Sequence, residues 1–270
     1  MEKLPRKNSI TSHLFHCLVN KDGVENNFLR MKNLTLLLAI ILISTITHSL
    51  FAQVVEVVKK GKSTPHERVT NFEYLEPNTI PKDASLVATL KATESGKDAT
   101  IPNLFFALKY KTYQLQGNSF KVIAFAKEKT SNKLELTIDV YYSNDSLLLV
   151  NRNNHIKNTV FIFGDEKGDD ETYSFSINEV EHEIKSGFYY KYVLAKGSQA
   201  EITQGKLVTN TMYVKWKENK VSQFRSLSKF GLAPTKESHD YLSRFFNMGA
   251  LNPIDNDLGY LLASLLKRKE

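Results

Sequence analysis

The most regular pattern in the chain runs from Leu134 to Tyr142, where apolar residues occupy every second position. Such a period of two predicts a β-strand with one buried face and one solvated face. Shorter alternations predict strands at 85–93 and at 120–126, the second with Phe120, Val122, Ala124 and Ala126 on one face. Val54 to Val58 either add an edge strand or belong to a linker over 53–82.

A helical period lies between the first two of these strands. Thr100 has the side chain of a helix N-cap, and Pro102 falls in the first turn, where a missing N–H costs little. Gly117 is expected to end the helix. The order strand, helix, strand, strand predicts a small β-α-β-β domain over 83–150. The residues expected on the buried helical stripe are Ile101, Leu104, Phe105, Leu108 and Leu115.

Beyond residue 156 the helical period disappears, and short β-type segments follow one another at close spacing. A series of such strands predicts an antiparallel β-sandwich over 156–230. Asn178-Glu179 is placed for a tight turn between two of them. Val221 to Leu227 is expected to pair back on the strand before it, which holds Met212, Val214 and Trp216.

The chain ends in two predicted helices over 235–270. The first covers 238–248. The second is capped by Asp257 and carries a leucine stripe that is expected to dock on the domain, while Lys267 and the two residues after it complement its negative end. The expected fold is therefore α+β: a small β-α-β-β domain, then an antiparallel β-sandwich and a C-terminal helical tail.

The strongest functional signal lies near the N-terminus. Residues 31–52 begin with Met31 and a basic residue, continue as an almost unbroken apolar run and finish with the small residue Ala52. This is the layout of a secretory signal peptide. On this interpretation residues 1–30 are a spurious or disordered extension. The mature chain is expected in the periplasm or cell envelope of a Gram-negative bacterium.

An alternative keeps residues 34–52 as an uncleaved anchor in the inner membrane, with the rest of the chain outside. The run is short for a membrane-spanning helix, and Thr45, Thr47 and His48 dilute its second half, so cleavage is favoured. The only cysteine, Cys17, precedes the run. No disulfide, thiolate nucleophile or lipid attachment is therefore expected in the mature chain.

Charge and motifs exclude several classes of function. The net charge of +7 is spread along the chain, and export argues further against nucleic-acid binding. The sequence has no glycine-rich phosphate loop, no G-x-S-x-G elbow and no zinc-type histidine pair. The acidic run from Asp165 to Glu171 lacks the spacing of a calcium loop and predicts a solvated hairpin loop. We expect no cofactor or metal, and we assign no catalytic residue.

Short motifs of turn residues and alternating apolar residues recur beyond residue 158. They are Phe161-Ile162-Phe163-Gly164, Tyr173-Ser174-Phe175-Ser176-Ile177-Asn178, Gly187-Phe188-Tyr189-Tyr190 and Ala195-Lys196-Gly197. Through these motifs, residues 158–228 resemble the small immunoglobulin-like, PEGA-like domains of exported envelope proteins of the Bacteroidota type. Residues 86–142, with Gly117-Asn118 before the second strand, are similar to small α+β envelope domains. The resemblance implies an envelope protein and supplies no catalytic residues.

A binding face is the remaining candidate site. Residues 188–192 are dense in aromatic side chains, and a later strand adds lysines. An exposed row of rings and ammonium groups suits stacking on sugars or holding a peptide, although core packing explains one face equally well. The residues expected on this face are Tyr190, Tyr192, Tyr213, Lys215 and Lys217.

The leading hypothesis is an exported, non-enzymatic envelope protein that binds a protein, peptidoglycan or glycan partner. The competing hypothesis is a hydrolase of cell-wall or peptide substrates whose carboxylates meet only in the fold. An enzyme is expected to show a concave pocket with convergent acids of shifted pKa. A binding module is expected to show an exposed aromatic patch or an open sheet edge.

Overall fold

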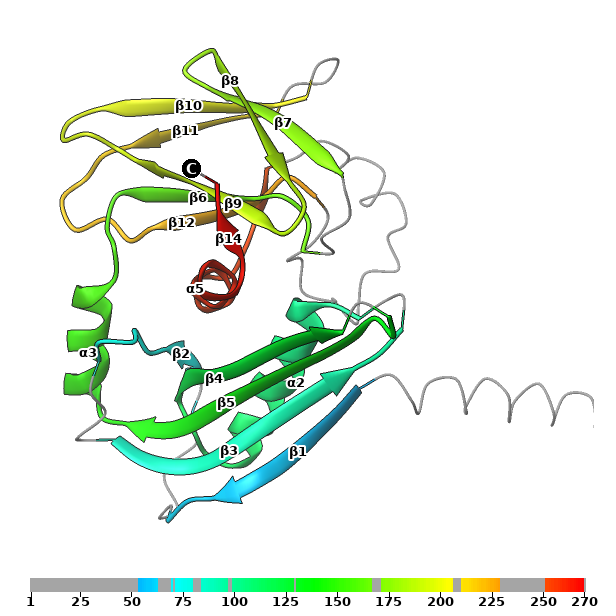
Figure 1. The fold of residues 1–270 in the computed structure, drawn as a ribbon. Helices are drawn as coiled ribbons and strands as arrows, with labels where there is room; N and C mark the ends of the chain where they lie inside the picture. Colours follow the sequence, from blue (N-terminus) through cyan, green and yellow to red (C-terminus); the bar gives the residue numbers. More distant parts are fainter. Residues whose placement is uncertain are drawn as a thin grey trace, which may run out of the picture. The chain divides into compact units, whose positions relative to one another are not determined.

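The computed structural model describes residues 53–62, 69, 71–79, 84–96, 99–128, 130–166, 171–205, 210–228 and 251–269. These residues belong to one compact unit, Ala52–Glu270. They form three β-sheets and three α-helices, and the predicted α+β class is confirmed (Figure 1). The predicted signal peptide at 31–52 and the predicted helix at 238–248 lie outside the described residues.

The first sheet has the strand order β1-β3-β5-β4-β2. The strand predicted from the clearest alternation is β5, at the centre, and its apolar face is buried. Residues 53–60 pair with β3 at the edge of the sheet, which is the edge strand that the sequence left open as the alternative to a linker. Residues 73–74 pair with β4, so the expected linker over 53–82 is corrected there. The strands are β1 (Gln53–Lys60), β2 (Glu73–Tyr74), β3 (Ala84–Glu94), β4 (Ser119–Glu128) and β5 (Lys133–Ser143).

The helix α2 (Ile101–Gln114) packs on the buried face of this sheet. Thr100 is its N-cap, as predicted, and the hydroxyl accepts a hydrogen bond from a backbone N–H of the first turn at 3.2 Å. Gly117 does not end the helix, because the C-cap is Leu115. Gly117 instead permits close packing, since a Cβ there would lie 2.3 Å from Cγ1 of Val140.

The strand β4 departs from the simple alternation of its sequence. Its pairing with β5 shifts register between Val122 and Ala124, which marks a β-bulge. The bulge reverses the expected faces beyond it, so that Ala124 is exposed and Phe125 packs against the core. Ile123 within the bulge is also exposed.

A helix that the pattern did not predict, α3 (Asp145–Asn154), follows β5 directly. Asn144 is its N-cap, and the side-chain oxygen accepts a hydrogen bond from the backbone N–H of Leu147 at 2.9 Å. Leu147 and Leu148 are buried, whereas most of the other side chains of α3 are exposed. In the sequence, α3 spans the boundary between the two expected domains, 83–150 and 156–230.

The other two sheets pack face to face around a second core, as a sandwich (Figure 1). Their strand orders are β11-β10-β7-β8 and β13-β12-β6-β9-β14. The predicted turn at Asn178-Glu179 joins β7 and β8, and both residues have positive φ, as a type I′ turn requires. The strands are β6 (Thr159–Phe163), β7 (Thr172–Ile177), β8 (Val180–Lys185), β9 (Phe188–Val193), β10 (Gln199–Gln204), β11 (Asn210–Lys215), β12 (Gln223–Ser226), β13 (Asn252–Pro253) and β14 (Lys267–Arg268).

The strand β12 does not pair back on β11 as the sequence predicted. It lies in the other sheet and runs parallel to β6, with Phe224 opposite Phe161. The two rings stack with their centroids 4.9 Å apart. Phe224 is fully buried there because the ring also packs against the C-terminal helix, α5 (Asn256–Leu265).

The C-terminal helix α5 docks on the domain through its leucine stripe, as predicted. Leucines of the predicted stripe of α5 are buried in one cluster with side chains from the first sheet and from β6. The N-cap is Asp255 and not Asp257, because the Asp255 carboxylate accepts the N–H groups of Asp257 and Leu258. Lys267 and Arg268, expected to complement the helix end, form β14 and pair with β9.

The strand β6 links the two cores. All five of its residues are buried. Val160 and Ile162 face the sandwich core, whereas Phe161 and Phe163 face the core shared with α5 and the first sheet. The core on the α5 side of β6 therefore contains residues of both expected domains.

Candidate functional site

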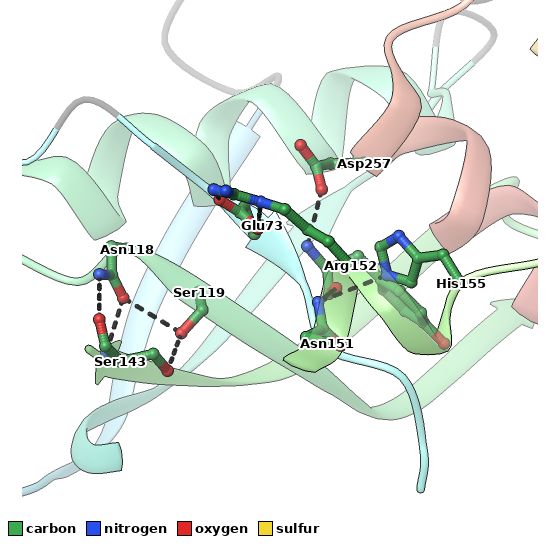
Figure 2. Close-up of polar contacts among 9 residues, drawn as sticks. Glu73, Asn118, Ser119, Ser143, Asn151, Arg152, His155 and Asp257 are labelled. Carbon is green, nitrogen blue, oxygen red and sulfur yellow. Dashed lines mark hydrogen bonds and ion pairs between the residues drawn. The ribbon is translucent and has the colours of Figure 1, made fainter. Parts of the chain in front are cut away.

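A cavity of about 350 Å³ lies where β2 meets α2, α3 and α5. We call it the polar pocket, because charged and aromatic side chains from all four elements line it. Figure 2 shows Glu73, Arg152, His155 and Asp257 converging on this region. The lining is Asn71, Phe72, Glu73, Lys109, Tyr113, Arg152, His155, Val221, Asn256, Asp257 and Tyr260.

Glu73 and Arg152 form a bidentate ion pair at the rim (Figure 2). The Arg152 Nε donates to one carboxylate oxygen of Glu73 at 2.9 Å, and a terminal guanidinium nitrogen donates to the other. Hydrogen bonding to Glu73 raises the pKa of Arg152. The paired geometry fixes both planar groups, so one side of the pocket is rigid and polar.

Asp257 projects from the first turn of α5 and accepts a hydrogen bond from the backbone N–H of Tyr74 at 2.8 Å. Burial raises the pKa of Asp257 to about 7, and the charges of Asp255 and Glu73 add to the rise. Lys109 opposes it from α2. Near neutral pH this carboxyl group is therefore only partly ionised, whereas an ordinary surface aspartate is fully ionised.

His155 forms the inner wall of the pocket and is 8% exposed. The imidazole packs on Tyr260, with ring centroids 4.1 Å apart. Burial lowers the pKa of His155 to about 4, and the positive charges of Lys157 and Arg152 lower it further. The ring is thus neutral at physiological pH. It contributes polar ring nitrogens to the pocket wall without a charge.

Asn151 holds the loop that follows β2 against α3. Its amide nitrogen donates to the backbone carbonyl of Tyr74 at 2.9 Å. Its amide oxygen accepts from the backbone N–H of Glu76 at 2.9 Å and from the hydroxyl of Thr79 at 3.0 Å. Because Asn151 is fully buried, these bonds fix the position of β2 relative to the pocket.

A second polar cluster in Figure 2 has a structural role. Asn118, Ser119 and Ser143 are buried and join the start of β4 to the end of β5. The two serine hydroxyls lie 2.7 Å apart, and the Asn118 side chain bonds both the N–H and the carbonyl of Ser143. With their polar atoms satisfied by one another, these residues offer little to a ligand.

The sequence-predicted binding face is not assembled in the structure. Tyr190 and Tyr192 on β9 pack against the sandwich core, and Tyr190 lies 4.8 Å from His182 between ring centroids. Tyr213 and Lys215 are exposed on β11, in the other sheet, and Lys217 follows that strand. Core packing, the alternative weighed from the sequence, accounts for the β9 tyrosines.

No residue of the polar pocket was assigned to a site from the sequence, and Asp257 was interpreted as a helix cap. Glu73 lies in the expected linker, and Arg152 and His155 follow from the unpredicted helix α3. Asn144 as an N-cap before a leucine run was the available signal for that helix. No signal in the sequence indicated that β2 and α5 meet.

Comparisons with family models, curated proteins and solved structures found no match. Within the part of the chain that the structure describes, no three His, Cys, Asp or Glu side chains group as a metal site. The helices described are each too short or too polar to cross a membrane. The polar pocket therefore has to be interpreted from its own chemistry.

Proposed function

We propose that this protein is an exported cell-envelope protein that binds a peptidoglycan-type glycan in the polar pocket. The observation that carries the proposal is the convergence of Glu73, Lys109, Arg152 and Asp257 on one cavity that also contains aromatic rings. Sugars present hydroxyl groups at their edges and apolar C–H faces, so they suit a site with paired polar groups and rings.

The charge of the pocket favours an acidic sugar. The Arg152 charge is matched by Glu73, and burial leaves Asp257 partly protonated near neutral pH. Lys109 forms no ion pair with any of the residues described. Because the neighbouring Asp257 is partly protonated, the Lys109 ammonium group attracts a ligand carboxylate, such as the lactyl group of N-acetylmuramic acid.

The test is a calorimetric titration of the natively processed protein with the disaccharide of N-acetylglucosamine and N-acetylmuramic acid. Lys109→Met removes the ammonium group from the pocket, and Lys215→Met removes one from exposed β11 as the matched control. A charge-assisted hydrogen bond contributes about 1.5–3 kcal/mol, so Lys109→Met is expected to raise Kd about tenfold or more. Loss of binding in Lys215→Met alone would instead support the face predicted from sequence.

A second candidate function is hydrolysis of the same glycan. It is favoured by the contrast between Asp257, with a pKa of about 7, and Glu73, which is held by a guanidinium group. Glycoside hydrolysis uses one carboxylic acid that is protonated at working pH and one carboxylate. Asp257→Asn keeps the oxygen that accepts from Tyr74 but removes the titrating proton. Release of reducing ends by the wild type and not by Asp257→Asn would establish this function, and no release by either would exclude it.

A further inference from the structure

A second cavity, of about 340 Å³, lies at the N-terminal end of α2. Its volume is within the range of small-molecule sites, about 300–1,000 Å³. Most of its lining is apolar and comes from β4, β5, α2 and the end of α5. The apolar side chains that line it are Ala99, Ile101, Phe125, Leu134, Leu265 and Leu266.

Among the described residues, one carboxyl group, that of Glu166, lines this cavity. Glu166 is 6% exposed, although the acidic run that contains it was expected to be a solvated loop. The Oε2 atom accepts a hydrogen bond from the backbone N–H of Ile101, the first residue of α2, at 2.7 Å. The Oε1 atom is buried and has no hydrogen-bond partner among the described residues. An unsatisfied buried oxygen is costly, so a ligand that bonds to it is stabilised.

The protonation state of Glu166 follows from its surroundings. Burial raises the pKa of this carboxyl to about 8, and the charges of Asp165 and Glu94 add to the rise. The Ile101 N–H and the Lys127 ammonium oppose it. Because Oε2 already accepts the backbone hydrogen bond, the proton is expected on Oε1. At neutral pH, Glu166, which lines the cavity, therefore carries an O–H donor.

Besides Glu166, the charged side chains among the described residues that line the cavity are both basic, whereas Asp165 and Glu94 do not line it. Lys127 and Lys267 both line it, and the Lys127 ammonium donates to the backbone carbonyl of Glu166 at 3.3 Å. Two ammonium groups repel a protonated amine, and a neutral alcohol has no charge for them to attract. An anionic head group attracts both lysines and also accepts the hydrogen bond from Oε1 of Glu166.

From this arrangement we infer that the cavity binds a single-chain aliphatic carboxylate. Its chain lies against the apolar lining, and its head group lies beside Glu166, Lys127 and Lys267. This site is separate from the polar pocket and does not depend on the glycan proposal, because the two cavities share no lining residue.

The inference is tested by calorimetric titration of the natively expressed full chain with decanoate, decanol and decylamine at pH 7.0. Decanoate is expected to bind at least about tenfold more tightly than decylamine, because two ammonium groups face the head group. Lys267→Met should weaken decanoate binding, whereas Lys215→Met on β11 should leave it unchanged. Equal or tighter binding of decylamine, or no binding of decanoate, overturns the inference.

The pH dependence tests the role of Glu166 separately. Between pH 7 and pH 9.5 decanoate stays ionised, so a change in affinity reports the protein. Above a pKa of about 8 the wild-type affinity should fall about tenfold per pH unit as Glu166 loses its proton. Glu166→Gln keeps a neutral donor and should bind decanoate without that fall, whereas Glu166→Leu should bind weakly at every pH. A Glu166→Gln variant that keeps the wild-type pH dependence contradicts the inference.

Discussion

Asp257, in the first turn of α5, accepts a hydrogen bond at 2.8 Å from the backbone N–H of Tyr74 in β2. The two residues are 183 positions apart in the chain. Tyr74 and Tyr260 also stack, with ring centroids 6.0 Å apart. These contacts bring the C-terminal helix against the edge of the first sheet and so build the polar pocket from distant segments.

The first prediction concerns this hydrogen bond. Asp257→Ala leaves the Tyr74 N–H without its acceptor and is expected to lower the free energy of unfolding by about 1–3 kcal/mol in urea denaturation. The matched control is Asp145→Ala, which removes an exposed acid from the first turn of α3 and should change stability by less than about 0.5 kcal/mol. Equal effects of the two substitutions would show that Asp257 acts only as a helix-end charge.

The second prediction concerns His155 and acid. The folded pKa of about 4 lies below the ordinary value of 6.5, so between these values the unfolded chain binds a proton that the folded chain does not. The His155 contribution is therefore complete above pH 6.5 and is lost as the pH falls toward 4. Relative to His155→Gln, which does not titrate, the wild type should lose about 2–3 kcal/mol of unfolding free energy between pH 7 and pH 4. A constant difference across this range would contradict the prediction.

The third prediction concerns Glu166 and base, and it has the opposite sign. The folded pKa of about 8 lies above the ordinary value of 4.5, so the folded chain keeps a proton that the unfolded chain releases. Stability from this group is complete below pH 4.5 and falls by about 1.4 kcal/mol per pH unit up to pH 8. Thermal denaturation should show Glu166→Gln gaining stability relative to the wild type from pH 5 to pH 8. The control is Glu171→Gln, which replaces a nearby exposed carboxylate. If its stability changes with pH in the same way, the effect does not come from burial of Glu166.

The fourth prediction concerns Gly259 within α5. A Cβ at this position would lie 2.2 Å from Cγ of Phe224, so glycine is needed for the helix to pack on that ring. Gly259→Ala gains about 1 kcal/mol of helix propensity. Overpacking costs about 1–3 kcal/mol, so the substitution should destabilise the protein on balance. In a Phe224→Ala background the same substitution should become neutral or stabilising, and strict additivity of the two would contradict this contact.

The sequence predicted those elements whose patterns are local and regular. The alternation in β5, the Thr100 cap of α2 and the Asn178-Glu179 turn follow from side-chain period and backbone preference. The bulge at Val122 and Ala124 does not, because an extra residue in a strand leaves no mark in composition.

The local sequence patterns did not predict how elements far apart in the chain pack on one another. The stripe of α5 indicated a docking face, but nothing local showed that it docks between β6 and the first sheet. The polar pocket depends on that placement, because α5 supplies Asp257 and β2 supplies Glu73. The same holds for Glu166, whose burial depends on its contact with the start of α2.

The most direct test of the proposed glycan site is hydrogen–deuterium exchange of the natively processed protein, with and without saturating N-acetylglucosamine–N-acetylmuramic acid disaccharide. Binding in the polar pocket is expected to slow exchange at residues 71–76 and 151–155, which lie in and beside the pocket, and at the start of α5. No change is expected in β11, which holds Tyr213 and Lys215. Slower exchange in β11 alone, or no change anywhere in the presence of the disaccharide, would contradict the assignment of the polar pocket as the binding site.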